Sequence, residues 1–146
     1  MRVVKRIFVI GALFILVLAL GACSALSDAA NLQSYDFGND QVPSITSVVG
    51  ERTVTGVSTG TGTGGQYKEF KYKADDPIAD IQAYINVLQN QGWIVTQNDG
   101  DGHTSGTVQI GIESVDIDMI ILVTITYDTS SYTLYVNKVI GTLNRY

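Results

Sequence analysis

Acidic side chains alternate with the only histidine in one glycine-containing segment, and such residues are candidate metal ligands. Asp99, Asp101 and His103 lie at alternate positions, as at the start of a calcium-binding loop. An EF-hand loop that begins at Asp99 needs glycine at its sixth position and glutamate at its twelfth, but these positions hold Thr104 and Ile110. Turn-forming residues explain the composition of the segment. We therefore expect residues 98–105 to form a surface loop, with weak calcium binding as the less favoured alternative.

Two further groups of residues could support hydrolysis, but neither has the context that its chemistry requires. His103 and Ser105 offer a base and a nucleophile, yet no nucleophile-elbow sequence surrounds the serine, and no second histidine is present for a zinc site. Glu113, Asp116 and Asp118 offer the paired carboxylates of glycoside chemistry, but they cluster in one segment. We read this segment as a solvated acidic turn. We expect no catalytic residue, no metal and no cofactor.

The glycine-rich run of residues 60–65 matches the G-x-G-x-x-G pattern of dinucleotide-binding turns. That chemistry needs a helix directly after the glycines, because the helix N-terminus holds the pyrophosphate. Residues 67–73 alternate as a strand instead, with Phe70 and Tyr72 on one side. The run is therefore predicted to be a mobile hairpin loop.

The strongest chemical signal is the single cysteine, Cys23, which ends the one strongly apolar segment. Arg2, Lys5 and Arg6 precede fourteen residues, 7–20, that contain no charged or polar side chain. A helix of that length rises about 21 Å, which is shorter than the roughly 30 Å hydrocarbon core of a bilayer. Residues 1–22 are therefore predicted to be a signal peptide that directs the following chain out of the cytoplasm.

Leu20, Gly21, Ala22 and Cys23 form an aliphatic residue, two small residues and a cysteine, and the segment thereby resembles a bacterial lipoprotein precursor. The resemblance covers residues 1–24 and implies cleavage between Ala22 and Cys23, with diacylglyceryl modification of Cys23. It also implies attachment to the lipid bilayer of the cell membrane or outer membrane, with the domain facing outside the cytoplasm. Ser24 is not the aspartate that favours inner-membrane retention. An uncleaved anchor or an ordinary secretory signal is the alternative.

The mature chain is acidic. All 14 Asp and Glu residues follow Ala22, but only six of the nine Lys and Arg residues do, so the mature net charge is about −8. Such a surface repels phosphate backbones, and no nucleic-acid partner is expected. The 124 residues that remain after residue 22 suit one domain.

Residues 23–43 read as an acylated cysteine and a flexible tether, in which Tyr35 and Phe37 are the side chains able to dock on the domain. Residues 44–146 read as a small α+β domain. Its helix, at about residues 77–91, begins after Asp76 with Pro77 at its first position. The apolar stripe of this helix is expected to consist of Ile78, Ile81, Ile85 and Leu88. The expected strands are residues 48–59, 67–73, 93–97, 107–113, 119–127 and 132–140.

The order β-β-α-β-β-β-β predicts an antiparallel sheet of about five to six strands with one helix packed on one face. The other face is then partly exposed, with Tyr127, Tyr132 and Tyr135 as candidates for a binding face. We expect a non-enzymatic binding or envelope-assembly module with a possible envelope protein partner. A small envelope hydrolase and a purely structural surface protein are the alternatives.

Overall fold

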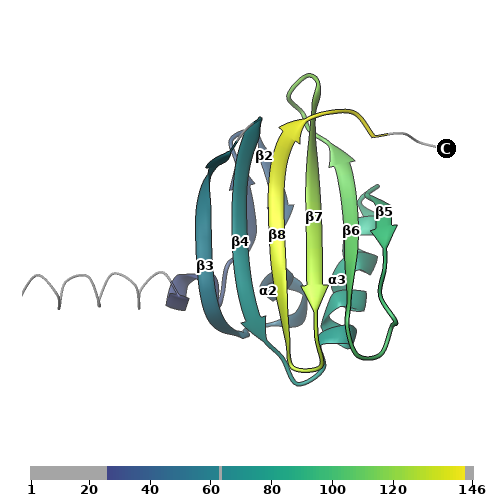
Figure 1. Cartoon of the computed structure of the whole chain (residues 1–146). Helices are drawn as coiled ribbons and strands as arrows, with labels where there is room; N and C mark the ends of the chain where they lie inside the picture. Colours follow the sequence, from purple (N-terminus) through teal and green to yellow (C-terminus); the bar gives the residue numbers. More distant parts are fainter. Residues whose placement is uncertain (1–25, 63, 144–146) are drawn as a thin grey trace, which may run out of the picture.

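Six antiparallel strands form the main sheet, in the spatial order β3-β4-β8-β7-β6-β5, and a single long helix packs on one side of it (Figure 1). The computed structural model describes residues 26–62 and 64–143; the predicted signal peptide and Cys23 lie outside them. The α+β prediction is confirmed. The strands are β3 (Thr53–Gly62), β4 (Gly65–Lys73), β5 (Ile94–Asn98), β6 (Gly106–Glu113), β7 (Met119–Tyr127) and β8 (Ser131–Ile140).

The long helix α3 (Pro77–Asn90) starts and ends where local sequence signals place it. The Asp76 carboxylate accepts a hydrogen bond from the Ala79 backbone N–H at 3.0 Å, which satisfies a free amide of the first turn. Gly92 takes a positive φ of 91°, as expected just beyond a helix. The predicted apolar stripe is correct for Ile81 and Leu88, which are buried. It omits Tyr84, which is fully buried, and includes Ile78 and Ile85, which are only partly buried.

A short helix, α2 (Ile45–Val49), occupies residues that were expected to lead into a strand. Its first turn is capped by Ser44, whose hydroxyl accepts a hydrogen bond from the Ser47 N–H at 3.0 Å. Gly50 ends the helix with a positive φ of 83°, and β3 begins only at Thr53. The prediction of a strand over residues 48–59 is therefore wrong at its start.

The segment predicted as a flexible tether contains a β-hairpin, β1 (Ser34–Phe37) and β2 (Asp40–Pro43). Tyr35 and Phe37 are each only 1% exposed, and Val42 is fully buried. Gly38, with a positive φ of 67°, opens the two-residue turn between the strands. The flexible-tether prediction is thus wrong for this segment, because its apolar side chains belong to the core and the domain begins before residue 44.

Four buried tyrosines, Tyr35, Tyr72, Tyr84 and Tyr132, connect the hairpin, α3 and the sheet. The Tyr35 and Phe70 rings stack with centroids 4.8 Å apart, and the Tyr35 and Tyr72 hydroxyls lie 3.2 Å apart. Tyr84 donates from its hydroxyl to the Pro43 carbonyl at 2.7 Å. Burial raises the pKa of Tyr72 to about 12, so this hydroxyl stays protonated and available for hydrogen bonding.

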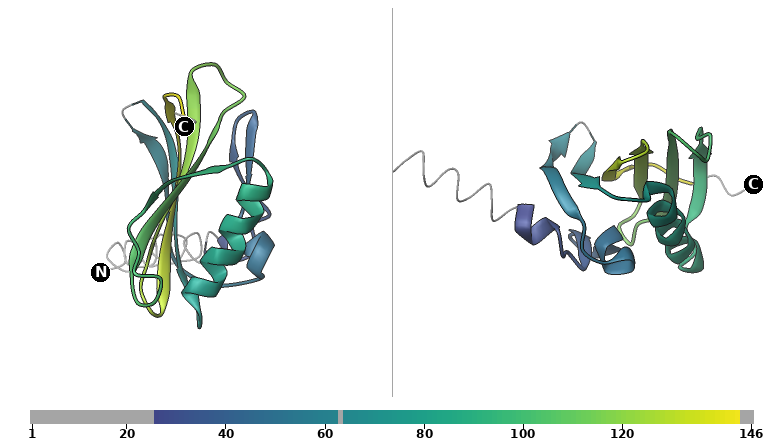
Figure 2. Two further views of the ribbon diagram at one scale, coloured as in Figure 1. Left: turned by 90° about the vertical axis from the view of Figure 1, so that its right-hand side faces the viewer. Right: turned by 90° about the horizontal axis from the view of Figure 1, so that it is seen from below.

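The two faces of the sheet differ in what covers them. Helices α2 and α3 and the hairpin β1–β2 lie together on one side, as the edge-on view of Figure 2 shows. Alternation along the strands places Leu134 and Val136 of β8 on this covered side, where they are fully buried. Tyr135, between them, lies on the opposite side, which we call the open face.

If the hairpin belongs to the core, Phe37→Ala will lower the free energy of unfolding by about 3–5 kcal/mol, because it leaves a cavity at a buried aromatic site. Gln41→Ala, at an exposed position of the same hairpin, is the matched control and should change stability by less than about 0.5 kcal/mol. Urea unfolding of both variants measures this difference. Equal stability of the two would mean that residues 34–43 act as a tether.

Candidate functional site

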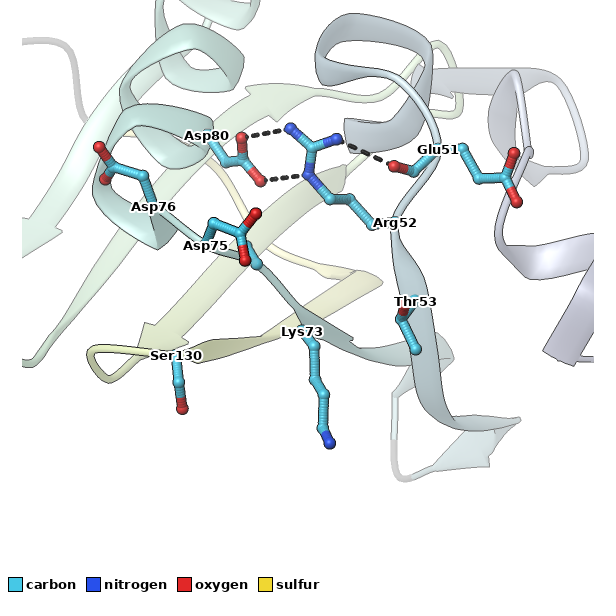
Figure 3. A pocket seen from close by; sticks show the side chains of 9 residues that line it. Glu51, Arg52, Thr53, Lys73, Asp75, Asp76, Asp80 and Ser130 are labelled. Carbon is cyan, nitrogen blue, oxygen red and sulfur yellow. Dashed lines mark hydrogen bonds and ion pairs between the residues drawn. The ribbon is translucent and has the colours of Figure 1, made fainter.

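A pocket of about 700 Å³ opens at the N-terminus of α3 (Figure 3). The start of β3, the end of β4 and the β7–β8 turn complete its walls. Its lining residues are mostly charged or polar: Glu51, Arg52, Thr53, Lys73, Ala74, Asp75, Asp76, Asp80 and Ser130.

A two-pronged ion pair forms one wall of this pocket. Arg52 donates from Nε to Asp80 Oδ2 and from Nη2 to Asp80 Oδ1, each at 2.7 Å. Tyr132 donates from its hydroxyl to Asp80 Oδ2 at 3.2 Å. The hydrogen bonds and charge of Asp80 raise the pKa of Arg52. Asp80 is only 7% exposed, so the pair ties α3 to the residue that directly precedes β3, and the Tyr132 bond ties α3 to β8.

The remaining pocket groups do not form a nucleophile–base pair among the described residues. The Ser130 hydroxyl donates to Asp128 at 3.2 Å, within the same turn. Asp76 caps α3, and Asp75, Glu51 and Lys73 are exposed at the rim. The pocket is therefore a solvated, charged depression whose buried members are engaged in holding the fold.

A second ionic cluster lies at the other end of β8 and joins three segments. Lys138 is 5% exposed, and its Nζ lies 2.7 Å from Asp40 of the hairpin and also contacts Asp116 of the β6–β7 loop. Asp40 accepts further hydrogen bonds from the Ser114 hydroxyl at 2.6 Å and the Val115 N–H at 3.0 Å. Burial acts to raise the pKa of Asp40, but the hydrogen bond from Lys138, the bonds from Ser114 and Val115, and the Lys138 charge outweigh it and hold that pKa below its usual value.

The three carboxylates considered for glycoside chemistry have different surroundings. Asp116 is paired with Lys138, which lowers its pKa, whereas Glu113 and Asp118 are exposed. A pocket of about 470 Å³ borders the Lys138 cluster, and Asp116 is the only one of the three that lines it. The three carboxylates therefore do not share this pocket.

The loop around His103 is closed by its own hydrogen bonds. Asp101 accepts from the backbone N–H groups of His103, Thr104 and Ser105 at 2.8, 2.7 and 3.1 Å, and also from the Thr104 hydroxyl. These bonds, that of the hydroxyl first, lower the pKa of Asp101. No group of three metal-ligating side chains is found within residues 26–62 and 64–143. Asp101 therefore serves as a turn-closing acceptor.

The glycine-rich run joins two strands as predicted, but the predicted loop is wrong for residues 60–62 and 65, which belong to β3 and β4. It supplies the end of β3 and the start of β4, with Gly62 opposite Gly65, and residue 63 lies outside the described part. Gly60 is needed for packing, because a Cβ there would lie 2.9 Å from the Tyr67 ring. A strand follows the glycines, so the run lacks the helix that a dinucleotide-binding turn requires.

The three tyrosines proposed as a binding face do not share a face. Tyr127 and Tyr132 pair across β7 and β8 on the covered side, where Tyr132 is 1% exposed and Tyr127 is partly buried. Only Tyr135 reaches the open face, because its position differs from that of Tyr132 by an odd number of residues. There it stacks on Tyr67 of β4 with ring centroids 5.5 Å apart.

The open face carries a row of polar side chains across the sheet. Thr96 Oγ1 donates to Gln109 Oε1 at 2.8 Å, and Gln109 Nε2 donates to Thr124 Oγ1 at 2.9 Å. The register continues this row through Tyr135, Glu69 and Ser58. We define the open-face site as this row together with Tyr67. Alternation along the sequence indicates that Tyr67 lies on the opposite side of its strand from Phe70 and Tyr72. It does not indicate that Tyr67 stacks on Tyr135 of another strand.

We expect Asp80→Ala to lower the free energy of unfolding by about 3 kcal/mol, because it leaves the partly buried Arg52 without its partner. Asp75→Ala, in the rim of the same pocket, should change it by less than about 0.5 kcal/mol. Chemical denaturation of the two variants makes the comparison. Similar losses in both would show that the Arg52–Asp80 pair does not hold the fold.

The Lys138 cluster should make stability depend on pH. Asp40 and Asp116 have lowered pKa values in the folded protein, so their stabilisation is present above the unfolded pKa of about 4 and is lost as the pH falls below it. Lys138→Met leaves Asp40 buried without a cation, which raises its pKa. The rise in unfolding free energy between about pH 3 and 5 should therefore be smaller in this variant. Lys71→Met, which removes an exposed ion pair with Glu69, should retain the wild-type slope; an unchanged slope in Lys138→Met would contradict the assignment.

None of the helices in the described part of the chain has the length and apolar character needed to cross a bilayer. Comparisons with models of known families, with curated proteins and with solved structures found no match to this chain. The functional argument therefore starts from the geometry of the site.

Proposed function

We propose that the chain is a lipoprotein anchored through acylated Cys23, and that its domain is a non-enzymatic binding module outside the cytoplasm. Its partner in this proposal is an envelope protein, which it contacts through the open-face site. The anchor rests on the residues Leu20–Cys23. The binding role rests on the open face of the sheet, which is the observation that carries the proposal.

The open-face site combines an aromatic pair with side chains that both donate and accept hydrogen bonds. Tyr67 and Tyr135 are partly exposed, and aromatic side chains are enriched at the centres of protein interfaces. Thr124 and Gln109 are already ordered by their mutual hydrogen bond, so binding would cost them little conformational entropy. The face thus carries side chains that are ordered by their own hydrogen bonds, and it can form both apolar and polar contacts.

The partners of the buried charged groups also support a non-enzymatic role. Asp80 and Arg52 bind each other, and Lys138 holds Asp40 and Asp116. Asp40, Asp80 and Lys138 are the buried charged side chains among the described residues, and their partners fix the positions of structural elements. Their chemistry serves stability.

The anchor would also orient the domain. Two residues separate Cys23 from Leu26, so the chain can span at most about 10 Å between them. Ala29 and Leu32 pack against the core on the covered side of the sheet. An acylated Cys23 would therefore draw the covered side toward the bilayer and leave the open face directed away from it.

The test is photo-crosslinking of the full chain in its native membranes, with benzoylphenylalanine at position 135. Position 86, exposed on α3, is the matched control. We expect one protein adduct at position 135 and none at position 86, and a weaker adduct when Tyr67→Ala removes about 2 kcal/mol of contact energy. Cys23→Ala should release the chain from the membrane fraction and abolish the adduct.

Equal crosslinking at the two positions, or none at position 135, would contradict the use of the open face. Continued membrane retention of the Cys23→Ala variant would contradict the anchor.

A further inference from the structure

Strand β3 forms one edge of the sheet and is not protected as edge strands usually are. It pairs with β4 on one side, and no described residue pairs with the other side (Figure 1). Edge strands are normally short, or carry charged residues, prolines or bulges that block further pairing. β3 has ten residues, none charged and none proline.

The protection that does exist is confined to one end of β3. A register shift between Val54 and Gly56 disturbs its first residues, but from Gly56 to Gly62 the pairing with β4 is regular. The opposite edge strand, β5, has only five residues and a register shift between Val95 and Gln97. A regular stretch of edge backbone is therefore available on β3 and is much shorter on β5.

We infer that β3 pairs antiparallel with β3 of a second copy of this chain, joining the two six-stranded sheets into one. A strand that adds to itself must be self-complementary about a two-fold axis. Ser58 and Gly60 lie on the open face, and Val57, Thr59 and Thr61 on the covered side, as their β4 partners show. Placing Thr59 opposite Thr59 sets each residue against one of the same face, which keeps both open faces on one side.

The uncharged composition of β3 permits pairing with a second copy. The mature chain carries about eight net negative charges, so two copies repel each other over most of their surface. Along β3 no charge opposes their approach, and small Thr, Ser and Gly side chains let the backbones meet. A charged foreign segment, by contrast, finds no complementary charge on β3.

The positions of Ala29 and Leu32 agree with this two-fold axis. This axis runs perpendicular to the sheet, so it keeps the covered sides of both copies together. Ala29 and Leu32 lie on that covered side, which brings both anchors to one bilayer. This orientation rests on the proposed acylation of Cys23. The paired sheets would then present two open-face sites side by side, and anchoring in one membrane would raise the effective concentration of the copies.

The experiment compares thiol crosslinking of two variants of the full chain in membranes. Acylation consumes the sulfur of Cys23, so Thr59→Cys introduces the only free thiol. A short bis-maleimide should convert most of this variant to a covalent dimer. Thr96→Cys, on the other edge strand, is the matched control and should give at least tenfold less dimer.

Two variants of opposite charge at position 59 distinguish a loss of β3 pairing from a loss of folding. Thr59→Lys should abolish dimer formation, because Thr59 lies beside Lys68 and the pairing would align four cations in one row. Mixing the Thr59→Lys and Thr59→Glu chains, each with a different tag, should restore co-purification, which loss of folding could not do.

Equal crosslinking of Thr59→Cys and Thr96→Cys, a crosslink from Thr59→Cys to a different protein, or no recovery in the mixed chains would overturn the inference. Maleimide labelling of the wild-type chain would show instead that Cys23 is not acylated. In that case the anchor proposal fails, and the same comparison in the Cys23→Ala background still decides the pairing of β3.

Discussion

One helix must cover one face of a six-stranded sheet, and this mismatch in size shapes the whole domain. Helix α3 has 14 residues and is about 21 Å long and 10 Å wide. Six strands spaced about 4.8 Å apart span roughly 24 Å. The helix therefore shields less than half of the face. The hairpin β1–β2 and helix α2 cover the rest, with Tyr35, Phe37 and Ile45 buried beneath them.

Two ionic clusters at opposite ends of β8 hold the covering elements in place. At one end, Arg52 and Tyr132 meet Asp80 of α3; at the other, Lys138 meets Asp40 of the hairpin. Each cluster joins elements that are distant in the sequence, and every buried polar side chain among the described residues has a hydrogen-bond partner. Among the described residues, those that precede β3 pack on the covered side and do not reach the open face. The open face and the unprotected edge of β3 both result from the packing of these elements on the covered side alone.

The parts that were predictable from the sequence are those fixed by neighbouring residues. Asp76, Pro77 and Gly92 define α3 by local capping, and the structure places its ends within one residue of the prediction. The hairpin was missed because each of its strands has only four residues, too few for a clear alternation. The Gly38–Asn39 pair between two short runs was the available signal, since such pairs favour two-residue hairpin turns.

The site was less predictable because it depends on pairing across strands. Tyr132 and Tyr135 belong to one strand, yet the first is buried and the second is on the open face. Which tyrosine stacks on Tyr135 depends on β4 lying next to β8, strands that are separated in sequence by α3 and three other strands. Likewise, Lys138, Asp40 and Asp116 carry no shared sequence motif, and only the fold brings them together.

Mass spectrometry of the mature N-terminal peptide, purified from membranes, tests the central claim most directly. The account predicts a peptide that begins at Cys23 and carries the added mass of a diacylglyceryl group on that residue. A peptide that retains residues before Cys23, or that begins elsewhere, with an unmodified Cys23 thiol, would contradict it.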